Sequence, residues 1–134
     1  MTLTDLYQRP GFLLRRTHQI SAAVFENACA SVGLTPAQYG VLTVLAAEPG
    51  LDQTRLSRAL AFDKVTVMRV LKGLEERGLL KRAQSALSRR QKTVALTPAG
   101  TALLAAAREP AERAYHRLLS PLDAAQRLQL IELL

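Results

Sequence analysis

The chain has 134 residues, of which 49% are hydrophobic and 4% aromatic, and it carries a formal net charge of +7 at pH 7. This length suits one domain whose core needs no metal, and the one cysteine excludes an intramolecular disulfide. Because no apolar run reaches about 18 residues and no signal-peptide pattern is present, we expect a cytoplasmic protein with no membrane span.

Capping residues mark the helix starts along the chain. Thr35 can cap a helix, with Pro36 at its first position and Gln38 completing a capping box. Other starts share a capping side chain: Asp52, Asp63, Thr97-Pro98 and Ser120-Pro121. The resulting map has helices at about 9–31, 35–47, 52–60, 63–77, 97–118 and 121–134, and a hairpin at 79–96.

The segment from 63 to 100 contains a helix, a basic hairpin and a second helix start, which is the order of a winged helix. By count, residues 52–97 hold eleven of the eighteen basic residues and four of the eleven acidic ones, and therefore the whole net charge of +7. A concentration of positive charge like this is typical of a surface that binds a polyanion such as DNA. We expect a mainly α fold with a small β-hairpin wing.

The helix at 63–77 has one apolar and one basic face. Its core stripe has the helical i, i+3, i+4, i+7 spacing and comprises Val67, Val70, Leu71 and Leu74. The opposite side and its flanks hold Lys64, Val65, Thr66, Met68, Arg69, Lys72, Gly73 and Glu76. Such a face fits the major groove, where Arg can bind guanine and Val or Met can contact a thymine methyl. The alternative is an ordinary solvated face.

The hairpin carries Arg89 and Arg90 in the loop from Gln84 to Gln91. Arginines at the tip of an extended loop can enter a narrow minor groove beside a recognition helix. The alternative is that this pair only aids solubility. Its position directly after a basic helix favours a DNA-binding wing.

The strings LxRALAFDKVTVMRVLKGLEERGLLKR and SRRQKTVALTPAG resemble the DNA-binding lobe of MarR-type transcriptional regulators. The resemblance covers nearly the whole chain. It implies one MarR-like domain at 1–134, with a winged helix-turn-helix lobe at 35–96 and dimerisation helices at 9–31 and 97–134. It also implies a recognition helix from Asp63 to Lys72.

The same resemblance implies that Arg90 is the wing arginine. Ser88 departs from the family pattern, because it stands where an aspartate usually precedes that arginine by two residues. Without this charge partner, we expect a more mobile wing.

The start of the chain, PGFLLRRTHQISAAVF, resembles the first helix of a MarR branch that responds to aromatic acids or their coenzyme A thioesters. Arg15, Arg16 and His18 form a polar cluster on this helix. With Tyr39, they are candidates for a pocket that binds a carboxylate or phosphate. The alternative is ion pairing between protomers or exposure to solvent.

The first helix carries one apolar stripe, the C-terminal region is apolar on more than one face, and the closing segment SPLDAAQRLQLIELL resembles a dimerisation helix. A bundle of these helices from two protomers would bury the apolar faces of a homodimer. The alternative is ordinary intrachain core. Pro110 lies inside the helix at 97–118, where we expect a kink or break near Arg108.

Catalytic signals are lacking: there is no nucleophile elbow, phosphate-binding glycine loop or metal-ligand spacing. We expect neither an enzyme nor a cofactor-binding protein. Cys29 lies between alanines and suits a small buried position better than a reactive thiol. Peroxide-sensing MarR proteins have their reactive cysteine near the start of this helix, which Cys29 does not match.

These observations predict a dimeric repressor that is released from a pseudo-palindromic DNA operator by a small aromatic acid or acyl-coenzyme A. One alternative is a ligand-blind architectural DNA-binding protein. Another is a redox regulator that uses Cys29.

Overall fold

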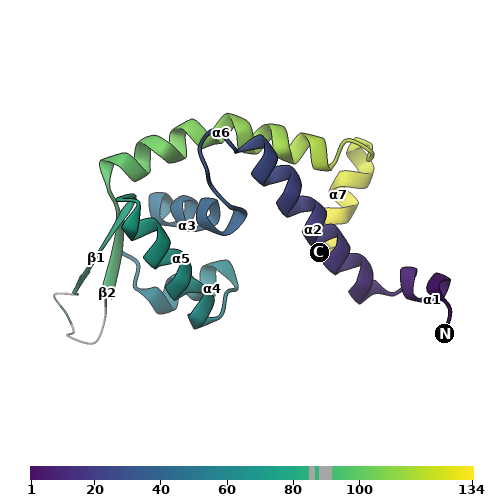
Figure 1. The fold of residues 1–134 in the computed structure, drawn as a ribbon, viewed down its shortest axis with the longest axis horizontal. Coiled ribbons are helices and arrows are strands. Elements are labelled where there is room, and N and C mark those ends of the chain that lie inside the picture. The colour runs from purple at the N-terminus through teal and green to yellow at the C-terminus, as the bar shows by residue number, and fades with distance from the viewer. Residues whose placement is uncertain (85–86, 88–91) are drawn as a thin grey trace. The chain divides into compact units, whose positions relative to one another are not determined.

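The structure is a computed structural model that describes residues 1–84, 87 and 92–134. Over these residues the chain forms, in order (Figure 1), α1 Leu3–Tyr7, α2 Pro10–Ala28, α3 Pro36–Ala47, α4 Gln53–Leu60, α5 Lys64–Glu76, β1 Leu80–Gln84, β2 Lys92–Leu96, α6 Pro98–Leu118 and α7 Ala124–Leu133. The mainly helical fold with one β-hairpin confirms the expected fold class. Residues Leu34–Arg108 form one compact unit, here called the central unit. The terminal unit comprises Met1–Gly33 and Glu109–Leu134.

The expected helix caps in the central unit are confirmed. Thr35 and Gln38 form the reciprocal capping box of α3, with Pro36 at the first helical position. Asp52 accepts a hydrogen bond from the Arg55 backbone N–H at the start of α4. Each cap satisfies a backbone N–H that has no partner inside its own helix.

The helices of the central unit enclose an aliphatic core. Val67, Leu71 and Leu74 of α5 are buried, and Val70 is half-buried, as the helical spacing predicted. Their buried neighbours come from α3, α4 and the segments around the hairpin: Leu34, Val41, Leu42, Leu45, Leu51, Leu56, Leu79, Leu80 and Val94. One face of α5 therefore packs against α3 and α4, and the opposite face is exposed.

The hairpin is antiparallel, with Leu80 opposite Leu96 at its base and Gln84 opposite Lys92 at the far end of the described pairing. The hairpin is also held at the edge of β2 that does not pair with β1, where the Val94 N–H donates to the Leu51 carbonyl at 2.9 Å. The turn before β1 uses Gly78, whose φ of 72° is the left-handed conformation that ends many helices.

The start of α6 is held tightly against this hairpin base. The Thr97 hydroxyl donates to the Gly78 carbonyl at 2.6 Å and accepts from the Gly100 N–H at 3.1 Å, which confirms Thr97 as the cap. A Cβ on Gly100 would lie 2.0 Å from the Leu79 carbonyl oxygen, so this position requires glycine.

The terminal unit departs from the sequence-based map in four places. Helix α2 ends at Ala28 rather than at 31. The short helix α1, capped by Thr2, was not expected. The last helix begins at Ala124 rather than 121, because Asp123 and Gln126 form its capping box. Helix α6 runs through Pro110 without a break, so the loss of one N–H donor does not end it.

The terminal unit leaves many large apolar side chains exposed: Leu3, Leu6, Tyr7, Leu13, Leu14, Ile20, Tyr115, Leu128, Ile131, Leu133 and Leu134. None of the helices in the described part of the chain is long and apolar enough to cross a bilayer.

Candidate nucleic-acid interface and effector pocket

The outer face of α5 is exposed, as expected for a recognition helix. Lys64, Arg69 and Lys72 are exposed cations, while the apolar Val65 and Met68 are 78% and 45% exposed. Thr66 lies half-buried beside them. The structure thus brings these six predicted residues together on one helix. The combination of cations with apolar and hydroxyl groups suits base edges and phosphates alike.

Asp63 fixes the start of this helix. Its carboxylate accepts from the Thr66 backbone N–H at 2.7 Å and from the Thr66 hydroxyl at 3.0 Å. The backbone hydrogen bond of Thr66, followed by its side-chain hydrogen bond, lowers the pKa of Asp63. The carboxylate is therefore charged at neutral pH. Its negative charge also interacts favourably with the positive end of the α5 helix dipole.

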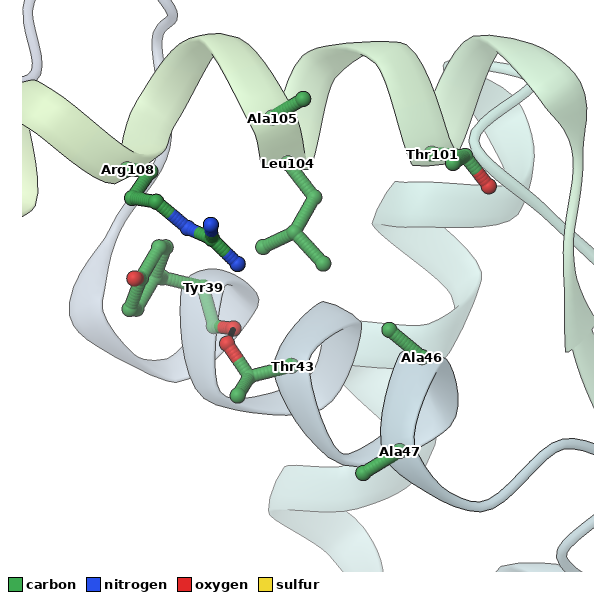
Figure 2. Close-up of a pocket in the computed structure, with 8 residues that line it drawn as sticks. All are labelled: Tyr39, Thr43, Ala46, Ala47, Thr101, Leu104, Ala105 and Arg108. Carbon is green, nitrogen blue, oxygen red and sulfur yellow. Dashed lines mark hydrogen bonds between the residues drawn. The ribbon is translucent and has the colours of Figure 1, made fainter.

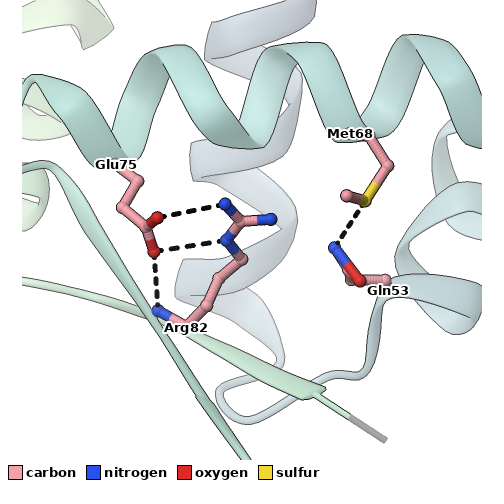
Figure 3. A network of polar contacts seen from close by, with 4 residues as sticks. All are labelled: Gln53, Met68, Glu75 and Arg82. Carbon is pink, nitrogen blue, oxygen red and sulfur yellow. Dashed lines mark hydrogen bonds and ion pairs between the residues drawn. The ribbon is translucent and has the colours of Figure 1, made fainter. Parts of the chain in front are cut away.

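A second helix contributes to this surface in a way that the sequence reasoning missed. Gln53, at the first position of α4, directs its amide Nε2 at the Met68 sulfur, 3.0 Å away (Figure 3). A cavity of about 170 Å³ lies between the two helices and is lined by Gln53, Thr54, Ser57, Lys64, Val67 and Met68. The sequence signal for this position was the Asp52 cap, because a cap at Asp52 makes Gln53 the first residue of α4.

An ion pair joins α5 to the wing. The Arg82 guanidinium of β1 donates from Nη2 to Glu75 Oε1 at 3.0 Å and from Nε to Glu75 Oε2 at 3.2 Å (Figure 3). The Arg82 backbone N–H donates to the same Oε2 at 3.3 Å. The side-chain hydrogen bond from Arg82 is the main cause of the lowered pKa of Glu75, and the same bond raises the pKa of Arg82.

The predicted wing arginines, Arg89 and Arg90, lie outside the described residues, and so does Ser88. Their role in DNA binding stays a prediction. The described part of the hairpin carries two further exposed cations, Lys81 and Lys92.

The four predicted effector residues lie on two different units. Arg15, Arg16 and His18 are exposed on α2 of the terminal unit, and the Arg15 guanidinium carbon lies 5.5 Å from the centre of the Phe12 ring. Tyr39 lies on α3 of the central unit, where it lines a cavity of about 500 Å³.

This larger cavity lies between α3 and the first part of α6, and all of its lining residues belong to the central unit (Figure 2). Its lining is Tyr39, Thr43, Ala46 and Ala47 from α3, and Thr101, Leu104, Ala105 and Arg108 from α6. Figure 2 shows the Arg108 side chain reaching from α6 toward α3. The lining combines small and apolar groups with one guanidinium, which suits a flat, apolar ligand that carries an anion.

Sequence reasoning missed every residue of this cavity except Tyr39. The signal was the helical spacing, because positions 39, 43, 46 and 47 share one helix face, as do 101, 104, 105 and 108. That spacing identifies two faces but does not indicate that they oppose one another.

Cys29 is buried, with 0% of its surface exposed, as the sequence indicated. Burial raises the pKa of the thiol, against a smaller opposing effect of Arg113. A thiol that stays protonated and inaccessible is poorly suited to peroxide sensing. Among the described residues, no cluster of three or more His, Cys, Asp or Glu could hold a metal ion.

Comparison with known proteins shows that the chain is similar to a family of transcriptional regulators. A sequence profile of the MarR family matches residues 32–91. The chain is 35% identical over 125 residues to a proposed transcriptional regulatory protein for the hcr operon of Thauera aromatica, covering 92% of this chain and 75% of that protein.

Two solved structures share the fold over nearly the full length. The transcriptional repressor CouR, bound to a 23-mer DNA duplex, superposes with a TM-score of 0.88 at 34% identity, covering 99% of this chain and 94% of CouR. BpsR of Bordetella bronchiseptica, whose DNA binding is regulated by 6-hydroxynicotinic acid, has a TM-score of 0.88 at 32% identity, covering 94% and 90%.

Proposed function

Because the chain belongs to the MarR family of winged-helix transcriptional regulators, we propose that it is a dimeric repressor whose operator binding is relieved by a small aromatic acid. The observation that carries the DNA-binding part is the exposed basic face of α5. The likeness to DNA-bound CouR supports the same use of the same fold.

In this proposal, α5 lies in the major groove. Arg69 binds a guanine edge, Val65 and Met68 contact thymine methyl groups, and Lys64 and Lys72 neutralise phosphates. Arg89 and Arg90 enter the neighbouring minor groove. Gln53, whose amide already contacts the Met68 sulfur, contacts the sugar-phosphate backbone of the DNA next to Met68.

The homodimer is supported by the terminal unit, where leucines and isoleucines are exposed on both α2 and α7. Pairing these helices with those of a second copy would bury them. A two-fold dimer places its two recognition helices about one helical turn of DNA apart, roughly 34 Å, which requires a pseudo-palindromic operator.

The effector part rests on the cavity between α3 and α6. An aromatic ring would lie against Leu104 and the alanines, and its carboxylate would pair with the Arg108 guanidinium. The regulation of BpsR by 6-hydroxynicotinic acid supports an aromatic acid as the ligand class. Arg15 and Arg16, with His18 beside them, form the second polar group that could receive the anion.

DNA binding is tested first by selecting duplexes from a random library with the full-length protein. We expect a palindromic sequence bound at least about 10³-fold more tightly than bulk DNA. Arg69→Ala should cost about 1–3 kcal/mol and relax the preference at one base pair. Selection of no preferred sequence would indicate an architectural DNA-binding protein instead.

The effector site is tested by the change in melting temperature with 6-hydroxynicotinic acid and related aromatic acids. A ligand at 100 times its Kd stabilises the protein by about 2.7 kcal/mol. Arg108→Gln should abolish this shift, whereas Arg117→Gln, which removes the same charge farther along α6, should keep it. If Arg16→Ala abolishes the shift and Arg108→Gln does not, the anion binds at α2.

A further inference from the structure

We propose that Glu75 and Arg82 are positioning residues that hold the base of the wing against the recognition helix, so that Glu75 strengthens DNA binding despite its negative charge. The proposal rests on the proposed function, because it concerns how α5 and the wing reach DNA together. It assigns a role to residues outside the DNA-contacting face.

The geometry of this pair distinguishes it from an ordinary surface ion pair. Both carboxylate oxygens of Glu75 are engaged, and one of them also accepts the Arg82 backbone N–H. The Arg82 side chain is 18% exposed and that of Glu75 40% exposed. A bidentate, partly buried pair with a backbone contact fixes direction as well as distance, which a mobile surface pair does not.

The pair completes the anchoring of the hairpin base on both edges. Arg82 lies opposite Val94 in the β-ladder, and the Val94 N–H donates to the carbonyl of Leu51, just before α4. Thr93 also pairs with Asp52, the cap of α4. Strand β2 is thus joined to the start of α4, and Glu75 joins β1 to the end of α5.

Anchoring at the base matters because the orientation of the base sets the position of the far end of the hairpin. Each residue of an extended strand adds about 3.3 Å, so a small rotation at Arg82 produces a larger displacement farther along the hairpin. A hydrogen bond weakens steeply when its donor angle falls below about 120°. DNA contacts made by the wing therefore depend on the direction set at its base.

Simple electrostatics predicts the opposite effect for Glu75. It is one of the four acidic residues at positions 52–97, and replacing any of them by a neutral residue raises the positive charge that faces DNA. If charge alone mattered, its removal would tighten binding to every duplex. The sign of the change in affinity therefore separates positioning from charge.

The experiment compares full-length Glu75→Gln with the wild type on the duplex that the wild type selects from a random library. Glutamine keeps the shape of the side chain but loses the charge-assisted pair. We expect about tenfold weaker binding, and a salt dependence whose slope falls by about 1 for each phosphate that the wing no longer neutralises. Glu48→Gln, which removes the same charge from the end of α3, should bind as tightly as the wild type or slightly more tightly.

A hydroxyl-radical footprint locates the weakened region. Protection should fall where the wings contact the flanks of the duplex and stay unchanged over the two major-groove half-sites. The double exchange Glu75→Arg with Arg82→Glu restores an ion pair of reversed polarity, and it should recover part of the affinity that each single exchange removes. This recovery tests pairing itself rather than either side chain.

Equal or tighter operator binding by Glu75→Gln, at an unchanged melting temperature, would overturn the inference and leave the proposed function intact. Loss of half-site and flank protection together would overturn it as well, because the pair would then support the whole lobe. If the wild type selects no duplex at all, the proposed function itself fails.

Discussion

The central and terminal units treat apolar side chains in opposite ways. The central unit buries its leucines and valines around α5. In the terminal unit the described buried apolar residues include Cys29, Ala114 and Leu119, while many larger side chains remain exposed. The central unit thus has a core of its own, whereas the terminal helices leave apolar faces exposed, which a second copy would cover in the proposed dimer.

The difference also separates two kinds of function. A lobe with its own core can hold a recognition helix in a fixed position, as readout of DNA sequence requires. Helices whose faces are completed by a partner can set the distance between two such lobes. The following experiments test whether the two units differ in this way.

The largest effect is expected on dimer affinity, from the exposed apolar side chains of α7. Leu128 and Ile131 lie one helical turn apart on α7 and are 64% and 55% exposed. Each side chain contributes about 1.5–3 kcal/mol when fully buried, and each occurs twice in a dimer. The double exchange to alanine should raise the dimer Kd by at least about a hundredfold, measured by sedimentation equilibrium. An unchanged dimer would show that other faces pair.

The central unit should instead respond through its own stability. Leu71 is fully buried, so Leu71→Ala removes apolar packing and leaves a cavity. We expect a loss of about 2–5 kcal/mol in the free energy of unfolding, measured by urea denaturation. Leu71→Met keeps the volume and should cost less than about 1.5 kcal/mol. Equal losses in the two variants would contradict tight packing at this site.

A smaller loss is expected at the joint between the hairpin and α6. Gly100→Ala places a methyl group against the Leu79 carbonyl and should cost about 1–3 kcal/mol as the backbone shifts. Gly73→Ala is the matched control, because nothing lies within 4 Å of its new Cβ on α5. In a helix interior that change should stabilise by about 0.5–1 kcal/mol. A stability change of the same sign in both variants would contradict the close approach of Gly100 to the Leu79 carbonyl.

The smallest expected effect is a change in stability that appears only at acidic pH. The hydrogen bonds from Thr66 lower the pKa of Asp63 in the folded protein. Its contribution to stability is therefore complete above the unfolded pKa of about 3.9 and is lost as the pH falls through the folded value. Asp63→Asn keeps a capping oxygen but does not titrate there. The stability difference between wild type and variant should shrink below about pH 4, and a constant difference would contradict this linkage.

Local sequence signals predicted most of the central unit. The caps at Thr35, Asp52 and Asp63 act through backbone N–H groups a few residues away. Such contacts are decided within one helical turn. The buried and exposed faces of α5 follow equally from spacing, because a helix repeats every 3.6 residues. Both could therefore be predicted without knowledge of any distant segment.

The misplaced start of α7 also has a local cause. Ser120 and Pro121 match a helix start, but Asp123 with Gln126 offers a reciprocal box that satisfies two backbone N–H groups. Two valid capping signals lay three residues apart, and the stronger one began the helix. The break that Pro110 could have caused does not occur, since a long helix can continue past one missing hydrogen bond; the kink stays a prediction.

The sequence by itself determined the helix caps, the core face of α5 and the basic surface opposite it. The tertiary structure decided that Arg108 shares a cavity with Tyr39, that Gly100 abuts the Leu79 carbonyl, and that Arg82 meets Glu75. Caps and faces depend on neighbours within a turn or two of the chain. A cavity wall or an ion pair between a helix and a strand depends instead on how separate elements pack, which no local pattern specifies.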